Sequence, residues 1–331
     1  MKRYRVILFA GLVVLVLLMS ACGESDKYKN LDDSKITVIA TLFPQYDFAR
    51  QIAGEYANVV LLLPPGMESH SFDPSPADII AIQNADVFLY TGQYMESWAA
   101  DVLEGLEGET YVVDVSAHVP LVKEEDIEEE YRRLHVEEGH EEHSEEHIHD
   151  SGHIHTYDPH IWTNPVYAMI MVEDIAEALM ACDPSHREIY KENAAKYLSE
   201  LENLDADIRD MVAHATQKEL FFGGRFAMYY FAREYRLLYE SVYDSCSSET
   251  EPSVRAVVHM VKEMKEKQIP VIYYEELVEP RIARTIAEET GSEMLLYHSC
   301  HSVSKQDLKD GVTYLSLMRQ NLLHLKAGLC G

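Results

Sequence analysis

Short apolar runs that suit β-strands alternate with helical stretches along most of this chain, and this alternation restricts the fold more than any other feature. In the first half the strand-like runs are 36–42, 58–63, 86–90 and 111–115, with helical stretches at 45–54 and 76–84. Strands that alternate with helices usually form βαβ units around a parallel sheet, because each helix carries the chain back across the sheet. The first half is therefore predicted to be an α/β lobe.

The second half repeats the alternation after a long helical stretch. Strands are expected at 219–222, 237–243, 271–274 and 293–297, and helices at 227–235, 252–267, 280–290 and 312–326. In the stretch 184–214, apolar residues recur at spacings of three or four, as on one face of a helix: Tyr190, Ala194, Tyr197, Leu201, Leu204 and Ile208. The predicted fold is α/β, with two lobes, each a parallel sheet flanked by helices, at residues 36–183 and 215–331. The linker helix 184–214 joins them, and a cleft lies between them.

The first 22 residues have the layout of a secretory signal. Lys2, Arg3 and Arg5 precede the apolar run 6–19, which is too short to span a bilayer comfortably as a permanent helix. The run ends in LMSAC, which resembles the site at which bacterial lipoproteins are cleaved and acylated on the new N-terminal cysteine. We therefore expect Cys22 to be lipidated, residues 23–35 to be a tether, and the protein to be extracytoplasmic and held at the lipid bilayer by the acyl anchor. An uncleaved anchor with an incidental cysteine is the alternative.

The charge of the chain argues for a cationic ligand. The formal net charge is −29, and removal of the three cationic residues of the signal brings the mature chain to −32. So negative a protein is repelled by nucleic acid and by anionic membrane surfaces, and it attracts cations. Nucleic acid is therefore excluded as a partner.

Several histidines lie where a ligand site is expected. In open parallel sheets, ligands bind beyond the carboxyl ends of the strands. Imidazoles follow two expected strands and precede one helix, and they are His70, His160, His298 and His301. Any one of them alone is more often a structural residue. Their shared placement favours a site for Zn²⁺ or another late divalent metal, because neutral imidazole is a preferred ligand of these ions.

Four segments carry a family resemblance: LPPGMESHSFDPSP at 63–76, DPHIWTNP at 158–165, EPS at 251–253 and YLSLM at 314–318. They resemble the cluster A-I zinc and manganese solute-binding proteins of ABC importers, typified by the zinc uptake binding protein of Gram-negative bacteria. The resemblance extends over 36–326. It implies two α/β lobes joined by one long helix with metal at their interface, no catalytic activity, and an ABC permease with its ATPase as partners. It also implies that His70 and His160 are the first two metal ligands.

The other two ligand positions depart from the family pattern. Arg225 stands at the third position, usually His or Glu, and a guanidinium has no lone pair to give a cation. His298 stands at the fourth position, usually Asp, with His301 close behind it. The predicted ligands are His70, His160, His298, and either His301 or a carboxylate such as Glu275. A decayed or repurposed site, marked by Arg225, is the alternative.

The segment 124–155 is dominated by Glu, Asp and His with a few small residues, so it cannot bury a core and is predicted to be a loop. Its seven histidines are proposed as an auxiliary metal site, weaker than the cleft, because neutral imidazoles next to carboxylates attract and bind cations: His135, His140, His143, His147, His149, His153 and His155. A merely solvated loop is the alternative. In the resembling family such loops accompany zinc, so Zn²⁺ is the expected cargo and Mn²⁺ the alternative.

Four cysteines follow Cys22: Cys182, Cys246, Cys300 and Cys330. Their wide spacing excludes a compact zinc-finger framework. Cys246 and Cys300 both follow expected strands of the second lobe, and an oxidising compartment favours a disulfide between them over thiolate ligation.

Two other classes of function compete with metal capture for import. An extracellular zinc hydrolase would also use histidine ligands, but the chain lacks His-Glu-X-X-His and a convincing Gly-X-Ser-X-Gly elbow. A surface adhesin or a metal-storage lipoprotein is compatible with the same two lobes. We expect a monomer in every case.

Overall fold

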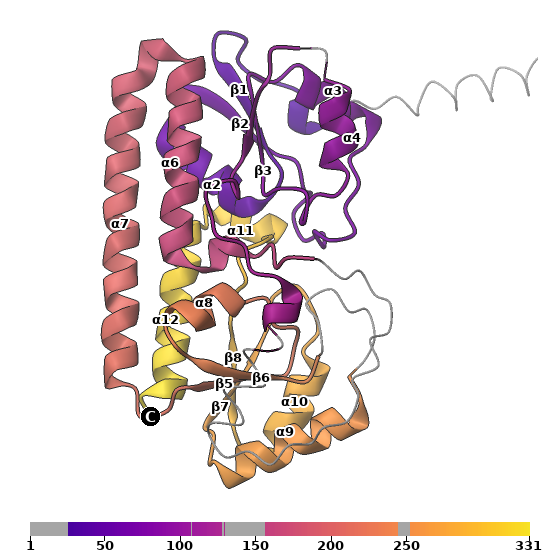
Figure 1. The fold of residues 1–331 in the computed structure, drawn as a ribbon, viewed down its shortest axis with the longest axis vertical. Coiled ribbons are helices and arrows are strands. Elements are labelled where there is room, and N and C mark those ends of the chain that lie inside the picture. The colour runs from indigo at the N-terminus through magenta and orange to yellow at the C-terminus, as the bar shows by residue number, and fades with distance from the viewer. Residues whose placement is uncertain (1–25, 107, 128, 130–155, 244–251) are drawn as a thin grey trace, which may run out of the picture.

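The structure is a computed structural model that describes residues 26–331, apart from residues 107, 128, 130–155 and 244–251. Its strands form two four-stranded sheets, one in each half of the chain (Figure 1). The first sheet has the order β2-β1-β3-β4 and contains β1 (Ile36–Ala40), β2 (Ala57–Leu61), β3 (Val87–Tyr90) and β4 (Tyr111–Asp114). The second has the order β6-β5-β7-β8 and contains β5 (Glu219–Phe222), β6 (Leu238–Ser241), β7 (Val271–Tyr274) and β8 (Glu293–Leu296). All pairings between these strands are parallel, which confirms the predicted fold class.

The helices of the first lobe begin where the sequence offers caps. They are α2 (Phe43–Ala53), α3 (Pro76–Gln83), α4 (Ala99–Glu104) and α6 (Pro165–Cys182), with the 3-10 turns η1 (Asp26–Tyr28), η2 (Ile161–Thr163) and η3 (Pro184–His186). Ser75 and Asp78 form a reciprocal capping box at the start of α3, and the Asn164 side chain accepts from the Val166 N–H at the start of α6. In both helices a proline occupies the first turn, where it removes an N–H that would have no partner.

The helices of the second lobe are α8 (Tyr229–Glu234), α9 (Val254–Glu266), α10 (Arg281–Thr290), α11 (Lys305–Asp310) and α12 (Tyr314–Leu329). The sequence did not predict α4 or α11, because each has only six residues and shows too little of the helical period. The end of α11 is fixed by Gly311, which adopts the left-handed conformation that favours glycine.

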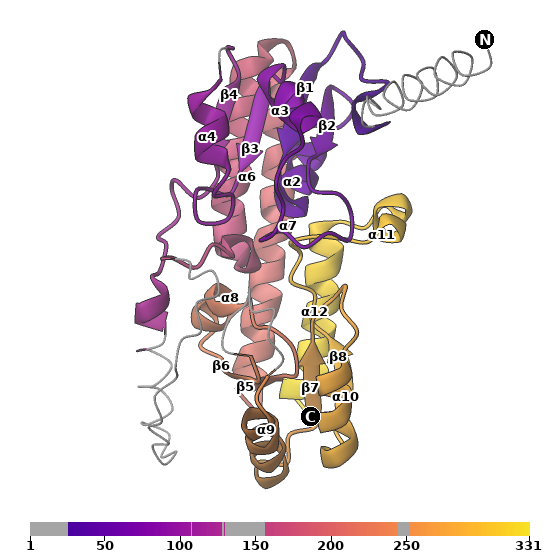
Figure 2. The ribbon, with the colours of Figure 1, turned by 90° about the vertical axis from the view of Figure 1, so that its right-hand side faces the viewer.

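The longest element, α7 (Arg187–His214), runs alongside both lobes (Figures 1 and 2). It packs against α6 and α2 in the first lobe and against α12 in the second. Its 28 residues make a rod of about 42 Å. The buried stripe contains all six apolar residues that the sequence placed on one face, and it continues through Met211 and Val212. The resulting core is continuous, because one cluster of buried side chains includes residues from both sheets.

The loop after β8 and the start of α12 are bonded directly to the first lobe. The Trp162 indole donates to the Ser299 carbonyl oxygen at 2.8 Å, and the Phe43 N–H donates to the His301 carbonyl oxygen at 3.3 Å. Asp47 of α2 is fully buried and accepts the backbone N–H of Tyr314, the first residue of α12, at 2.8 Å. Burial raises the pKa of Asp47, and the hydrogen bonds that its carboxylate accepts, that of the Tyr314 N–H first among them, oppose this effect.

The described cysteines are free thiols: Cys182, Cys300 and Cys330. The structure therefore does not support the disulfide expected between Cys300 and Cys246, a residue outside the described part. Cys300 is fully buried, and its thiol lies 3.6 Å from the His298 carbonyl oxygen, so it points into the core rather than toward a surface loop. In the part of the chain that the structure describes, no helix combines the length and apolar character needed to cross a membrane.

Asp47→Ala should lower the free energy of unfolding by about 1–3 kcal/mol, because it leaves the buried Tyr314 N–H without its acceptor. Urea denaturation followed by circular dichroism measures this. Glu192→Ala, which removes an exposed carboxylate from α7, is the control and should change stability by less than about 0.5 kcal/mol. Equal stability of the two variants would show that the Asp47 contact does not hold the lobes together.

Candidate metal centre

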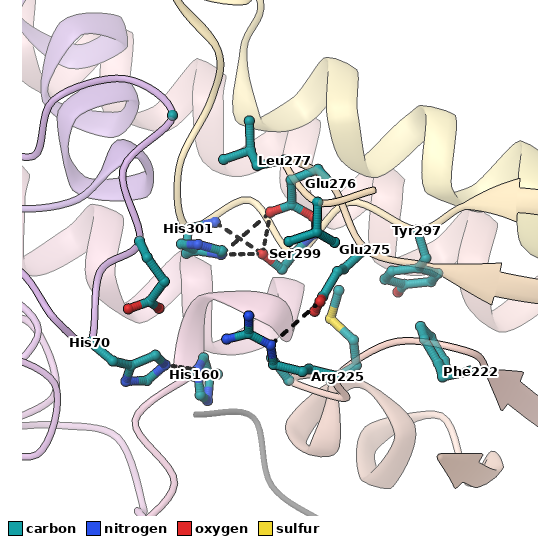
Figure 3. Close-up of a pocket in the computed structure, with 15 residues that line it drawn as sticks. His70, His160, Phe222, Arg225, Glu275, Glu276, Leu277, Tyr297, Ser299 and His301 are labelled. Carbon is teal, nitrogen blue, oxygen red and sulfur yellow. Dashed lines mark hydrogen bonds and ion pairs between the residues drawn. The ribbon is translucent and has the colours of Figure 1, made fainter. Parts of the chain in front are cut away.

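A pocket lies between the lobes, beyond the carboxyl ends of strands from both sheets (Figure 3). The first lobe contributes the loop after β2 and the residue before η2, and the second contributes the loops after β5, β7 and β8. The polar residues that line the pocket are Glu68, His70, His160, Arg225, Glu275, Glu276, Tyr297, Ser299 and His301. In the second sheet β5 and β7 are neighbours at the point where the strand order reverses, which is where open α/β sheets usually bind ligands.

The imidazoles of His70 and His160 lie next to each other on one side of this pocket (Figure 3). Their Nε2 atoms are 3.3 Å apart. Two nitrogens bound to one tetrahedral zinc at about 2.0–2.1 Å are separated by about 3.3–3.4 Å. The pair therefore already has the separation of two ligands that share one zinc ion. These are the two residues that the family resemblance implied as ligands.

The carboxylate of Asp158 fixes the orientation of the His160 ring. Its Oδ1 lies 2.9 Å from His160 Nδ1 and also accepts the His160 backbone N–H at 2.8 Å. The hydroxyl of Tyr230, in the second lobe, donates to the Asp158 carbonyl oxygen at 2.7 Å. A proton on Nδ1, shared with the carboxylate, makes Nε2 the acceptor nitrogen of the ring, on the side of His70. Carboxylates hold metal-binding histidines in this way in many proteins.

His301 has a similar environment in the second lobe. Its Nδ1 lies 3.3 Å from Glu276 Oε1 and is also in contact with the Ser299 hydroxyl. Burial lowers the pKa of His301, which favours the neutral imidazole that a metal requires. Burial favours the neutral form of Glu276 too, but His298, His301 and the Ser299 hydrogen bonds outweigh that effect and lower its pKa. Glu276 is therefore ionised and able to hold the Nδ1 proton of His301.

His298 does not line the pocket. Its Nδ1 accepts the Cys300 backbone N–H at 2.9 Å, and Asn321 bonds its backbone N–H and carbonyl groups at 2.8 Å each. Through these hydrogen bonds His298 stabilises the conformation of the loop after β8. His301, which the sequence placed second, is the imidazole of this loop that reaches the pocket.

Arg225 forms an ion pair in the pocket with Glu275, with Nε 3.5 Å from Oε1. Burial raises the pKa of Glu275 to about 7, and the charge of Arg225 opposes this effect. Arg225 and Glu275 were both expected at this site from the sequence, whereas Glu68 and Ser299 were not. The position of Glu68, two residues before His70 in the same loop, was the available signal.

Among the described residues, no group of three or more His, Cys, Asp or Glu side chains is arranged to hold a metal ion. In the described part of the chain, the imidazole pair is thus not accompanied by a third side chain in position to share a metal ion. Cys22, Cys246 and the seven histidines of the segment 124–155, from His135 to His155, lie outside the described residues.

Comparison with known proteins gives a consistent set of relatives. The family model described as ZnuA, zinc-uptake complex component A, periplasmic, matches residues 38–328. The chain is 33% identical over 327 residues to the high-affinity zinc uptake system protein ZnuA of Bacillus subtilis. This match covers 97% of the chain and 98% of that protein. It is also 33% identical over 320 residues to the zinc-binding lipoprotein AdcA of Streptococcus pneumoniae. That match covers 97% of this chain and 60% of AdcA, so the chain spans little more than half of that relative.

Solved structures show the same architecture. The metal-dependent lipoprotein YcdH of Bacillus subtilis superposes with a TM-score of 0.73 at 30% identity, over 90% of this chain and 100% of that one. The Zn(II)-bound ZnuA-like domain of Streptococcus pneumoniae AdcA gives 0.72 at 29% identity, with the same coverage. The laminin-binding protein Lmb of Streptococcus agalactiae, described as bifunctional with adhesin and metal-transporting activity, gives 0.70 at 26% identity over 88% of this chain and 99% of that one.

Asp158→Ala should weaken binding of added Zn²⁺ about 10–100-fold, because the His160 ring loses the carboxylate that orients it. Competition with a chromophoric chelator measures the affinity. Asp174→Ala is the matched control, since Asp174 makes an equivalent 2.9 Å pair with the exposed His118 outside the pocket. If both variants bind zinc like the unmodified protein, the Asp158 contact has no influence on the metal.

Proposed function

The chain belongs to the family of ZnuA, the periplasmic component A of zinc-uptake complexes, and from this premise we propose that it captures one zinc ion between its two lobes and passes it to a membrane permease. It is a zinc-uptake binding protein and an extracytoplasmic lipoprotein, and it is not an enzyme. Zn²⁺ is its cargo. The observation that supports the location of the ion is the 3.3 Å separation of His70 Nε2 and His160 Nε2.

The proposed ligands are His70, His160 and His301, with an oxygen ligand to complete the tetrahedron that zinc prefers. The first two come from one lobe and His301 comes from the other. An ion bound to all three would connect the lobes directly, so binding would be accompanied by a closer approach of His301 to the imidazole pair. His298 would act indirectly, through the shape of the loop that carries His301.

The partners belong to the proposal as well. As a component of a zinc-uptake complex, the protein is expected to dock on an ABC permease driven by an ATPase, as a monomer held to the bilayer through lipidated Cys22. The acidic, histidine-rich segment would bind additional zinc weakly. The residues that flank it are paired, because Lys123 and Tyr157 form an isolated antiparallel bridge. Tyr157 adjoins Asp158, so zinc collected by this segment would be released near the pocket.

Adhesion is a second candidate function. It is supported by the similarity to Lmb over nearly the whole of that chain, at 26% identity. The same fold accommodates both activities, because adhesion needs an exposed face and metal capture needs the pocket. Binding of zinc-loaded and zinc-free protein to immobilised extracellular-matrix proteins would test it.

The double variant His70→Ala, His160→Ala should lose the single tight zinc-binding event in calorimetry. We expect affinity to fall on the order of 100-fold or more, since loss of even an outer partner of a ligand costs about 10–100-fold. The control is His118→Ala, His259→Ala, which removes two exposed imidazoles from outside the pocket. A tight isotherm that survives in the first variant would refute the proposed site.

His301→Ala should weaken zinc more than His298→Ala, because His301 lines the pocket whereas His298 is bonded within its own loop. Zinc affinities of the two variants, measured at one pH near 7.5, give the comparison. Circular dichroism melting identifies any loss of folding in His298→Ala. A larger loss of affinity in a well-folded His298→Ala would restore His298 as the ligand.

A further inference from the structure

Arg225 is the only Lys or Arg among the described residues that line the pocket. Three carboxylates line the same space, namely Glu68, Glu275 and Glu276. In Figure 3 the guanidinium lies between the imidazole pair of His70 and His160 and the glutamates of the second lobe. A positive group that cannot act as a ligand thus occupies the middle of a pocket built for a positive ion.

The backbone holds Arg225 in this place. β5 and β7 are paired at Phe222 and Tyr273, so the segments that follow them leave the sheet side by side. Gly223 permits close packing on α10, because a Cβ there would lie 2.5 Å from the Ala283 Cα. At Gly224 an added Cβ would lie 3.4 Å from the Glu275 nitrogen, an ordinary van der Waals distance, so the two segments are neighbours there. The close packing at Gly223 and this contact place Arg225 beside Glu275.

Glu275 and Glu276 are neighbours in sequence but have different partners. Glu276 is bonded to the Ser299 hydroxyl and backbone N–H, at 2.5 and 2.9 Å, and is committed to the loop after β8. Glu275 makes a longer ion pair of 3.5 Å with Arg225 and accepts a backbone hydrogen bond from the same residue, and its side chain is 21% exposed. Of these two carboxylates, Glu275 is the one that can change partner without breaking the loop.

We propose that Arg225 is a resident counter-cation which holds Glu275 while the pocket is empty, and that Glu275 passes from the guanidinium to the metal when zinc binds. Glu275 then supplies the oxygen ligand that the three imidazoles lack. Arg225 and zinc thus compete for Glu275. This competition lowers the affinity for zinc and favours its release. The inference rests on the proposed zinc-binding function and concerns the fourth ligand of the same site.

Four proteins test this exchange: the unmodified protein, Arg225→Met, Glu275→Gln and the double variant. Methionine keeps an unbranched, flexible side chain and removes the charge. Zinc affinity is measured by chelator competition. Arg225→Met should tighten zinc binding about 10-fold or more, because a competing cation is removed. Glu275→Gln should weaken it about 10-fold or more, both alone and in the Arg225→Met background. The control pair is Arg284→Met and Glu279→Gln, which removes an exposed ion pair of 2.6 Å in the same lobe.

The double variant separates a ligand from a mere partner of Arg225. If Glu275→Gln has no effect once Arg225 is methionine, Glu275 only neutralises the guanidinium and the proposal is overturned. Weaker binding in Arg225→Met would overturn it too. Should a variant fail to fold, a zinc-loaded crystal structure of the unmodified protein decides: a Glu275 oxygen at about 2.0–2.2 Å from zinc supports the exchange, and an intact Arg225–Glu275 pair away from zinc refutes it. Failure of the proposed function itself would differ, because the unmodified protein would then show no tight zinc binding that depends on His70 and His160.

Discussion

The position of the loop after β8 relative to the pocket residues of the first lobe depends on the buried contacts that this loop and the start of α12 make with that lobe. Trp162 bonds the Ser299 carbonyl, and Asp47 accepts the first N–H of α12. A carboxylate at a helix N-terminus meets both an unpaired donor and the positive end of the helix dipole, so it is stabilised there even when buried. These contacts fix the loop that carries His301 relative to the loops that carry His70 and His160.

Each lobe contains a histidine whose ring is fixed by an adjacent carboxylate. Asp158 orients His160, and Glu276 orients His301. Both carboxylates have further partners: Asp158 accepts the His160 backbone N–H, and Glu276 accepts the Ser299 hydroxyl. The two rings are therefore already ordered in the folded protein, so binding of an ion would not have to order them.

The charge of the pocket explains why an arginine is tolerated in a cation site. Three glutamates with no counter-ion would repel one another in a partly buried space. The guanidinium of Arg225 relieves that repulsion. In the proposed exchange a divalent ion would also relieve it and would bond to the imidazoles, so Arg225 would stabilise the empty protein and oppose the filled one. The strongly negative surface, with a formal charge of −29, still draws cations toward the pocket.

The sequence by itself determined the strands, the long helix and the first two histidines. The spacing of apolar residues predicted the strands β5 and β7 and the buried face of α7, because this spacing reflects which side chains are buried. His70 and His160 followed from motifs whose spacing is local. Only the tertiary structure shows that His301 lines the pocket and His298 does not, although the two are three residues apart in one loop. Cys300 adopts a left-handed conformation with φ of 65°, which turns the chain between them, and Asn321 of α12 bonds His298 from a distant part of the sequence. The short helices and the Arg225–Glu275 pair were likewise decided by packing between segments that are far apart along the chain, and such packing leaves no periodic signal in the sequence.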